Sequence, residues 1–132
     1  MSDFAYGFER RLPGAGVEEA ERRVTDALKA EGFGILTRID VKDTLEKKLG
    51  ARISPYVILG ACNPPLAHRA LEAEPPIGLL LPCNVVVREI EGGEVAVSIA
   101  DPKAMFTLVD NPSVGPIAAE VDARLRRALA AL

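Results

Sequence analysis

Apolar residues recur along this chain with two different periods, and the change between them predicts a mixture of helices and strands. Residues 16–31 place apolar side chains at three- and four-residue spacing, with glutamates near the start, which is typical of an amphipathic helix ending at Gly32. Residues 114–132 show the same spacing along one stripe and predict a second long helix. Shorter helices are expected over residues 40–49, from Asn63 to about Glu74, and from Asp101 through Phe106.

Segments rich in β-branched and aromatic residues lie between these helices and predict the strands. They cover residues 4–12, 33–41, 53–61, 83–90 and 94–100. In the first strand Phe4, Tyr6 and Phe8 fall on one side, and we expect all three rings in the core. In the second strand, alternation predicts one face formed by Phe33, Ile35, Thr37, Ile39 and Val41.

The last two strands predict a β-hairpin, because they are joined across Gly92-Gly93. A two-residue loop would pair Arg88 with Val97. A three-residue loop over residues 91–93 instead pairs Val87 with Val97 and Val85 with Ile99, which keeps the apolar side chains together on one face. The three-residue loop is therefore favoured.

Composition and charge narrow the class of protein. The chain has 132 residues, of which 48% are hydrophobic, and this is enough for one domain over residues 1–132. Its net charge is -3, with acidic and basic residues interspersed, so no basic patch for nucleic acid is expected. The start of the chain has no signal-peptide core and the longest apolar run is too short to cross a bilayer, so we expect a soluble cytoplasmic protein without a membrane partner.

The candidate chemistry lies in two Cys-Asn segments, Cys62-Asn63 and Cys83-Asn84. Asn63 is followed by Pro64, which suits an N-cap and a first helical residue; Asp101-Pro102 and Asn111-Pro112 repeat the same arrangement. Cys62 would precede a helix N-terminus, where a thiolate is stabilised, or else it is simply a small buried residue. For Cys83, burial is the favoured interpretation.

If the strands that carry these segments are neighbours, the segments meet at one edge of the sheet beside Asp101. A shared pocket of Cys62, Asn63, Cys83, Asn84 and Asp101 is then the hypothesis. It could act as a redox dithiol, as a thiolate metal site, or only as a hydrogen-bonded structural network. A closed zinc site needs about four ligands, so only a site shared across a dimer could complete one.

No known catalytic motif accompanies the thiols. His68 is the only histidine, and its helical position opposite Ala70 and four residues before Glu72 predicts a solvated surface residue. No phosphate-binding glycine loop or nucleophile triad is present. The sequence therefore names no catalytic residues, no metal and no cofactor.

The two Cys-Asn segments also carry a resemblance to a known family. The motifs are Gly60-Ala61-Cys62-Asn63-Pro64, Ala67, Ala70-Leu71, Leu80-Leu81-Pro82-Cys83-Asn84-Val85 and Asp101-Pro102. They resemble the family called domain of unknown function 302, and the chain is similar in character to its small single-domain members of the Thermus type. The resemblance implies an α+β fold with a curved, mainly antiparallel sheet and helices packed on one face, similar to a single TATA-binding-protein repeat. It also implies a homodimer, but no DNA binding and no established activity.

Two classes of function follow. The first is a small dimeric binding module whose pocket at the Cys-Asn segments takes a small molecule or a metal. The second is a thiol-dependent redox enzyme that uses Cys62 and Cys83 as a pair. Binding ranks first, because no acid-base partner accompanies the thiols.

If Asn63 only caps its helix, Asn63→Asp should leave stability nearly unchanged.

Overall fold

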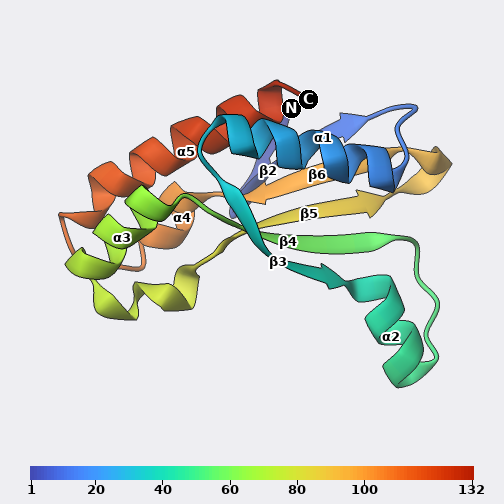
Figure 1. Ribbon diagram of the computed structural model, residues 1–132, viewed down its shortest axis with the longest axis horizontal. Coiled ribbons are helices and arrows are strands. Elements are labelled where there is room, and N and C mark those ends of the chain that lie inside the picture. The colour runs from blue at the N-terminus through green and yellow to red at the C-terminus, as the bar shows by residue number, and fades with distance from the viewer.

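One antiparallel sheet of six strands forms the framework of the molecule (Figure 1). A computed structural model describes residues 1–132. The strands lie side by side in the order β1-β2-β6-β5-β4-β3, and every neighbouring pair is antiparallel. Their bounds are β1 Ser2–Phe4, β2 Gly7–Leu12, β3 Gly34–Asp40, β4 Tyr56–Cys62, β5 Cys83–Glu89 and β6 Val95–Ala100.

Five α-helices and two 3₁₀ segments complete the chain. Their bounds are α1 Val17–Ala30, α2 Val41–Leu49, α3 Pro64–Ala73, η1 Pro75–Leu80, η2 Glu91–Gly93, α4 Pro102–Phe106 and α5 Val114–Ala130. All five predicted helices are therefore present. None of them is long and apolar enough to cross a membrane.

The core lies between one face of the sheet and the two long helices. The apolar stripe of α1 is buried through Ala20, Val24 and Leu28, and α5 contributes eight buried residues, including Leu125. Helices α1 and α5 pack against each other and on the sheet (Figure 1). The expected α+β architecture, with helices packed on one face of a curved antiparallel sheet, is confirmed.

The hairpin of β5 and β6 has the register predicted from the three-residue loop. Val87 pairs with Val97 and Val85 pairs with Ile99. These four side chains are almost fully buried, at 0–1% exposure. Because alternate residues point to opposite faces, Asn84, Val86 and Ser98 belong to the other side of the sheet. We call this side, which also carries Glu9 and Ile58, the open face.

The predicted first strand is wrong in two respects. The chain reverses between Phe4 and Gly7, which are paired, so residues 4–12 form parts of two strands, β1 and β2. Only Phe8 is buried; Phe4 is 39% exposed and Tyr6 is 72% exposed. The rings of Phe4 and Tyr6 stack edge to face on this turn, with centroids 4.9 Å apart. A tight turn thus occupies the position where uninterrupted alternation was expected.

The predicted single face of residues 33–41 is also wrong, because a β-bulge interrupts β3. Ile35 pairs with Ala61, but Thr37 pairs with Gly60, which is directly adjacent to Ala61 in β4. Leu36 therefore has no partner of its own. One unpaired residue reverses the alternation. Ile35 therefore lies on the core side, whereas Thr37 lies on the open face with Gly60. A Cβ on Gly60 would collide with Thr37 Oγ1, so this crossing requires glycine.

Asn111 does not cap the last helix as predicted. Helix α5 begins at Val114 with Ser113 before it, and the side-chain oxygen of Asn111 accepts a hydrogen bond from the Ser113 amide at 3.0 Å. The Asn111 amide donates to the Ala73 carbonyl at 2.8 Å, at the end of α3. Tertiary contact with α3, which the local sequence does not reveal, determines the role of this residue.

Candidate functional site

The two Cys-Asn segments meet because β4 and β5 are neighbours. Ala61, one residue before Cys62, is paired with Cys83 across the two strands. Beyond Cys62 the chain turns directly into α3, whose first residues are Pro64 and Pro65. Glycine at position 60 allows close packing here as well, because a Cβ there would lie 2.7 Å from Cγ of Pro82.

A pocket of about 260 Å³ opens at this end of the sheet. It is bounded by β4 and β5, by the start of β3, by α3 and η1, and by α4 and α5. The residues from the sheet and its edges are Phe33, Leu36, Ala61, Cys62, Asn63, Leu81, Pro82 and Cys83. The residues from the helical segments are Leu66, Ala67, Ala70, Leu71, Gly78, Phe106, Ile117 and Val121.

The pocket is almost entirely apolar. Thirteen of its sixteen lining residues are hydrophobic, and none carries a charge. Its side-chain hydrogen-bonding groups are the amide of Asn63 and the two thiols. Such a lining, with few polar groups, is the usual composition of a site for small molecules.

Asn63 forms hydrogen bonds through both ends of its side chain at the wall of this pocket. Its side-chain oxygen accepts a hydrogen bond from the Leu66 amide at 3.3 Å, which caps α3 as predicted. Its Nδ2 donates to the Glu31 carbonyl at 3.4 Å, just beyond the end of α1. Arg124 of α5 also donates to that carbonyl, at 3.1 Å. Asn63 therefore joins α3 to α1 as well as capping α3.

Neither thiol ionises readily. Burial raises the pKa of Cys62 above its usual value of 9.0. Burial, together with the nearby Cys62, raises the pKa of Cys83 to about 11. The two prolines at the start of α3 also remove amide donors that could stabilise a thiolate. Both thiols are therefore protonated at neutral pH, and Cys83 is buried, as the sequence suggested.

The structure brings together three of the five candidate site residues. Cys62, Asn63 and Cys83 line the pocket. Asn84 is on the open face, where it borders a separate hollow of about 340 Å³ with Phe4, Tyr6 and Val86. The strand alternation that turns Cys83 towards the pocket turns Asn84 away from it.

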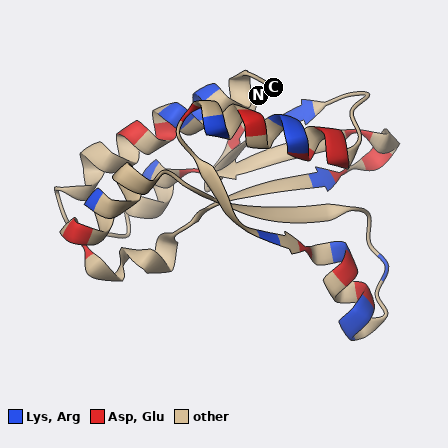
Figure 2. Ribbon diagram, in the orientation of Figure 1, with Lys and Arg blue, Asp and Glu red and all other residues tan.

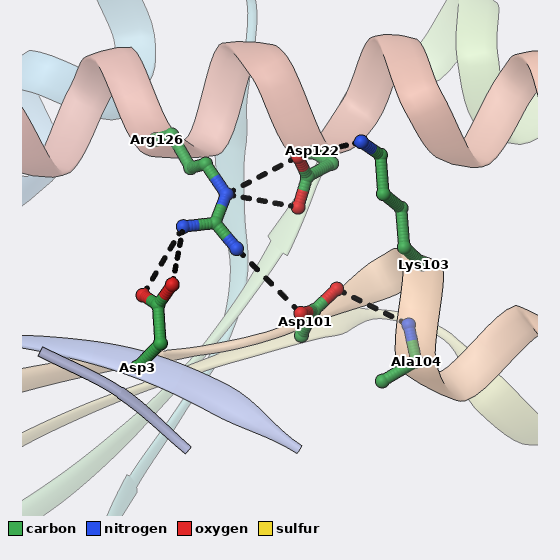
Figure 3. A network of polar contacts seen from close by, with 6 residues as sticks. All are labelled: Asp3, Asp101, Lys103, Ala104, Asp122 and Arg126. Atoms are coloured by element: carbon green, nitrogen blue, oxygen red, sulfur yellow. Dashed lines mark hydrogen bonds and ion pairs between the residues drawn. The ribbon is translucent and has the colours of Figure 1, made fainter. Parts of the chain in front are cut away.

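Asp101 lies outside the pocket and has a different partner. Its carboxylate caps α4 by accepting a hydrogen bond from the Ala104 amide at 3.1 Å, as predicted for Asp101-Pro102. The other carboxylate oxygen lies 3.6 Å from Nη2 of Arg126 (Figure 3). Asp101 thereby anchors α4, which supplies Phe106 to the pocket.

Arg126 is the centre of this polar network (Figure 3). It contacts three carboxylates, those of Asp3, Asp101 and Asp122, at 3.2, 3.6 and 3.2 Å. Asp122 is buried, and Lys103 approaches it at 3.7 Å. The guanidinium also lies 4.3 Å above the Phe8 ring, a cation–π contact. The network joins β1, α4 and α5, and none of its members lines the pocket.

Several pocket residues were not identified from the sequence. Phe33 and Phe106 come from two separate segments, and Ile117 and Val121 come from a third. The apolar spacing within each segment does not predict that the segments meet. His68 is exposed and lies 3.2 Å from Glu72, as its helical position predicted. No group of three or more His, Cys, Asp or Glu side chains is arranged to hold a metal ion.

Fold and site together define a small α+β protein with an uncharged, apolar pocket at one end of its antiparallel sheet. The chain belongs to the family described as Domain of unknown function DUF302, whose model matches residues 8–132, and this confirms the resemblance seen in the sequence. It is similar to a solved structure described as an uncharacterized conserved protein DUF302 from Bacillus stearothermophilus. The two are 32% identical with a TM-score of 0.84, over 94% of this chain and 97% of the other. A comparison with curated proteins finds no match.

Proposed function

We propose that this protein binds a small, largely apolar molecule in the pocket at its two Cys-Asn segments. The observation that carries the proposal is the pocket itself: about 260 Å³, with thirteen hydrophobic residues among sixteen. This volume is just below the range of about 300–1,000 Å³ common for small-molecule sites. Burial of apolar ligand surface would supply the affinity, at about 25 cal/mol per Å² of surface removed from water, before the costs of association.

A fluorescence titration tests this proposal. The probe is N-phenyl-1-naphthylamine, a neutral dye that emits strongly in apolar surroundings. Ala67→Phe fills part of the pocket, because Ala67 lines it and is half-buried. Ala119→Phe is the matched control, because Ala119 is exposed on α5 and does not line the pocket. We expect binding by the natural protein and by Ala119→Phe, and loss of binding in Ala67→Phe. Equal binding by all three proteins would overturn the proposal.

A metal in the same pocket is a weaker candidate. This chain would offer two thiols and one amide, and thiols bind metals as thiolates. The raised pKa values of Cys62 and Cys83 oppose their deprotonation. A metal site would therefore need ligands from a second copy.

Thiol-dependent redox chemistry is the second candidate function. The observation in its favour is that Cys62 and Cys83 line one pocket. Against it, exchange requires a thiolate, and both pKa values are shifted in the direction that removes it. Mass spectrometry after mild oxidation tests it: a Cys62–Cys83 disulfide that forms readily and reversibly would rank this function first.

We also propose that the protein is a homodimer, as the family resemblance implies, and that the open face provides the contact. This face presents apolar side chains such as Val86 and Ile58, while its charged residues Glu9 and Arg88 neutralise each other at 3.0 Å. Light scattering at micromolar concentration should report a dimer. Val86→Glu should dissociate it, whereas Leu49→Glu on exposed α2 should not. A monomeric natural protein would remove this proposal.

A further inference from the structure

We propose that the ligand of this pocket is a neutral amphiphile: an apolar body with one uncharged hydrogen-bonding group, such as a hydroxyl or a carbonyl, placed at Asn63. This inference rests on the proposed function and specifies the chemical class of its ligand. It excludes carboxylates, phosphates and amines of the same carbon skeleton.

The surroundings of the pocket favour a neutral ligand. No Asp, Glu, Lys, Arg or His residue lines it. The chain that forms one wall contains no charged residue from Pro75 to Val87. Figure 2 shows η1 and the start of β5 free of charged residues, in contrast to α1 and α5. An ion placed here would lose its hydration without gaining a counter-ion, which is strongly unfavourable.

The guanidinium of Arg124 does not change this conclusion. It reaches the Glu31 carbonyl at 3.1 Å, beside the backbone that Asn63 also contacts. Arg124 is not a lining residue.

The side chain of Asn63 can form more hydrogen bonds than it makes within the protein. A side-chain amide has two donors and an oxygen that can accept two hydrogen bonds. In the protein the oxygen accepts one bond, from Leu66, and the nitrogen donates one, to Glu31. By this count one donor and one acceptor site remain, and because Asn63 lines the pocket the proposal places both against the ligand. A hydroxyl matches both of them, whereas a carbonyl matches the donor alone.

The mouth of the pocket shows where the apolar body can extend. Leu36 and Leu71 line the pocket and are nevertheless 66% and 42% exposed, so they stand where it meets solvent. Leu36 owes this position to the β-bulge, which leaves it without a partner on β4. A ligand with its polar group at Asn63 can therefore continue past these two leucines.

Displacement of bound N-phenyl-1-naphthylamine by three eight-carbon compounds tests the inference. At neutral pH, 1-octanol is neutral, octanoate is an anion and octylammonium is a cation. We expect octanol to displace the dye at a concentration lower by on the order of tenfold or more, because burying an ion without a counter-ion costs far more than burying a hydroxyl that Asn63 can pair with. Equal potency of octanoate or octylammonium would overturn the neutral class while leaving the proposed function intact. If neither the dye nor any of the three compounds binds, both proposals fail.

A charge added at the mouth provides a second, independent test. Leu36→Lys places an ammonium group beside the pocket, at a position exposed enough to tolerate it. Leu49→Lys is the control, because Leu49 is 74% exposed on α2 and does not line the pocket. We expect Leu36→Lys to bind octanoate more tightly than the natural protein does, with Leu49→Lys unchanged. If Leu36→Lys leaves octanoate binding unaltered, charge is not what excludes anions and the inference is wrong.

Discussion

Ala61 and Cys83 are cross-strand partners in the antiparallel pair formed by β4 and β5. This pairing brings the two Cys-Asn segments to one end of the sheet, although they are twenty-one positions apart in sequence. It also separates the two asparagines. Asn63 is drawn into the helix that follows β4, whereas Asn84 remains within β5 and points to the open face.

We expect both thiols to be alkylated slowly at neutral pH. The thiolate is the reactive form, and a pKa of about 11 for Cys83 leaves about a hundredfold less thiolate than the ordinary value of 9.0 does. The rate for Cys83 should rise with pH until about pH 11. Cys62 is less buried and should react first. Iodoacetamide labelling followed by mass spectrometry gives the two rates.

Rapid labelling of Cys62 near pH 7 would contradict this account, because it would require a lowered rather than a raised pKa. Unfolded protein in denaturant is the control: there both cysteines should react alike, at the rate of a free thiol.

Asn63 should be more sensitive to substitution than a simple helix cap. Asn63→Ala loses the cap of α3 and the bond to the Glu31 carbonyl, so we expect a loss of about 1–2 kcal/mol in the free energy of unfolding. Asn63→Asp keeps the cap but sets a carboxylate against that carbonyl. The structure therefore revises the expectation of a neutral effect, and we expect a loss of about 1 kcal/mol.

Asp40 supplies the matched control. Its carboxylate caps α2 by accepting a hydrogen bond from the Asp43 amide at 2.9 Å. Asp40→Asn should be nearly neutral, since both residues cap well. Denaturant unfolding of the four proteins compares them directly. Equal stability of Asn63→Asp and the natural protein would show that the bond to Glu31 contributes nothing.

Arg126→Met should destabilise the fold by about 2–4 kcal/mol. The substitution leaves the buried carboxylate of Asp122 with Lys103, at 3.7 Å, as its remaining cation. Arg22→Met is the control: Arg22 pairs with Glu19 and Asp26 on the exposed side of α1, and should cost less than about 1 kcal/mol. Adding Asp122→Leu to Arg126→Met should recover stability, because it removes the unpaired charge. If the two arginine variants lose equal stability, the network has no special role.

Local patterns in the sequence predict some features of this fold and miss others. The helices could be predicted from apolar periodicity, because each helix buries one face. The β5–β6 register could be predicted from the turn length, because only one register buries the apolar side chains together. The turn at Phe4–Gly7 and the bulge at Leu36 did not, because each interrupts an alternation that the sequence continues. For the site, the neighbouring strands placed Cys62 and Cys83 together. The partner of Asp101, which is Arg126, depends on helix packing, and no local signal indicated it.

The most direct test of the central claim is to locate a bound ligand without altering the protein. Methyl NMR of protein labelled at Ile, Leu and Val, titrated with 1-octanol, reports on the pocket, the open face and α2 in one experiment. We expect saturable shifts at Leu66, Ile117 and Val121, which line the pocket, and none at Val86 on the open face or at Leu49 on α2. Shifts confined to Val86 and its neighbours, or no saturable shifts at all, would contradict the account.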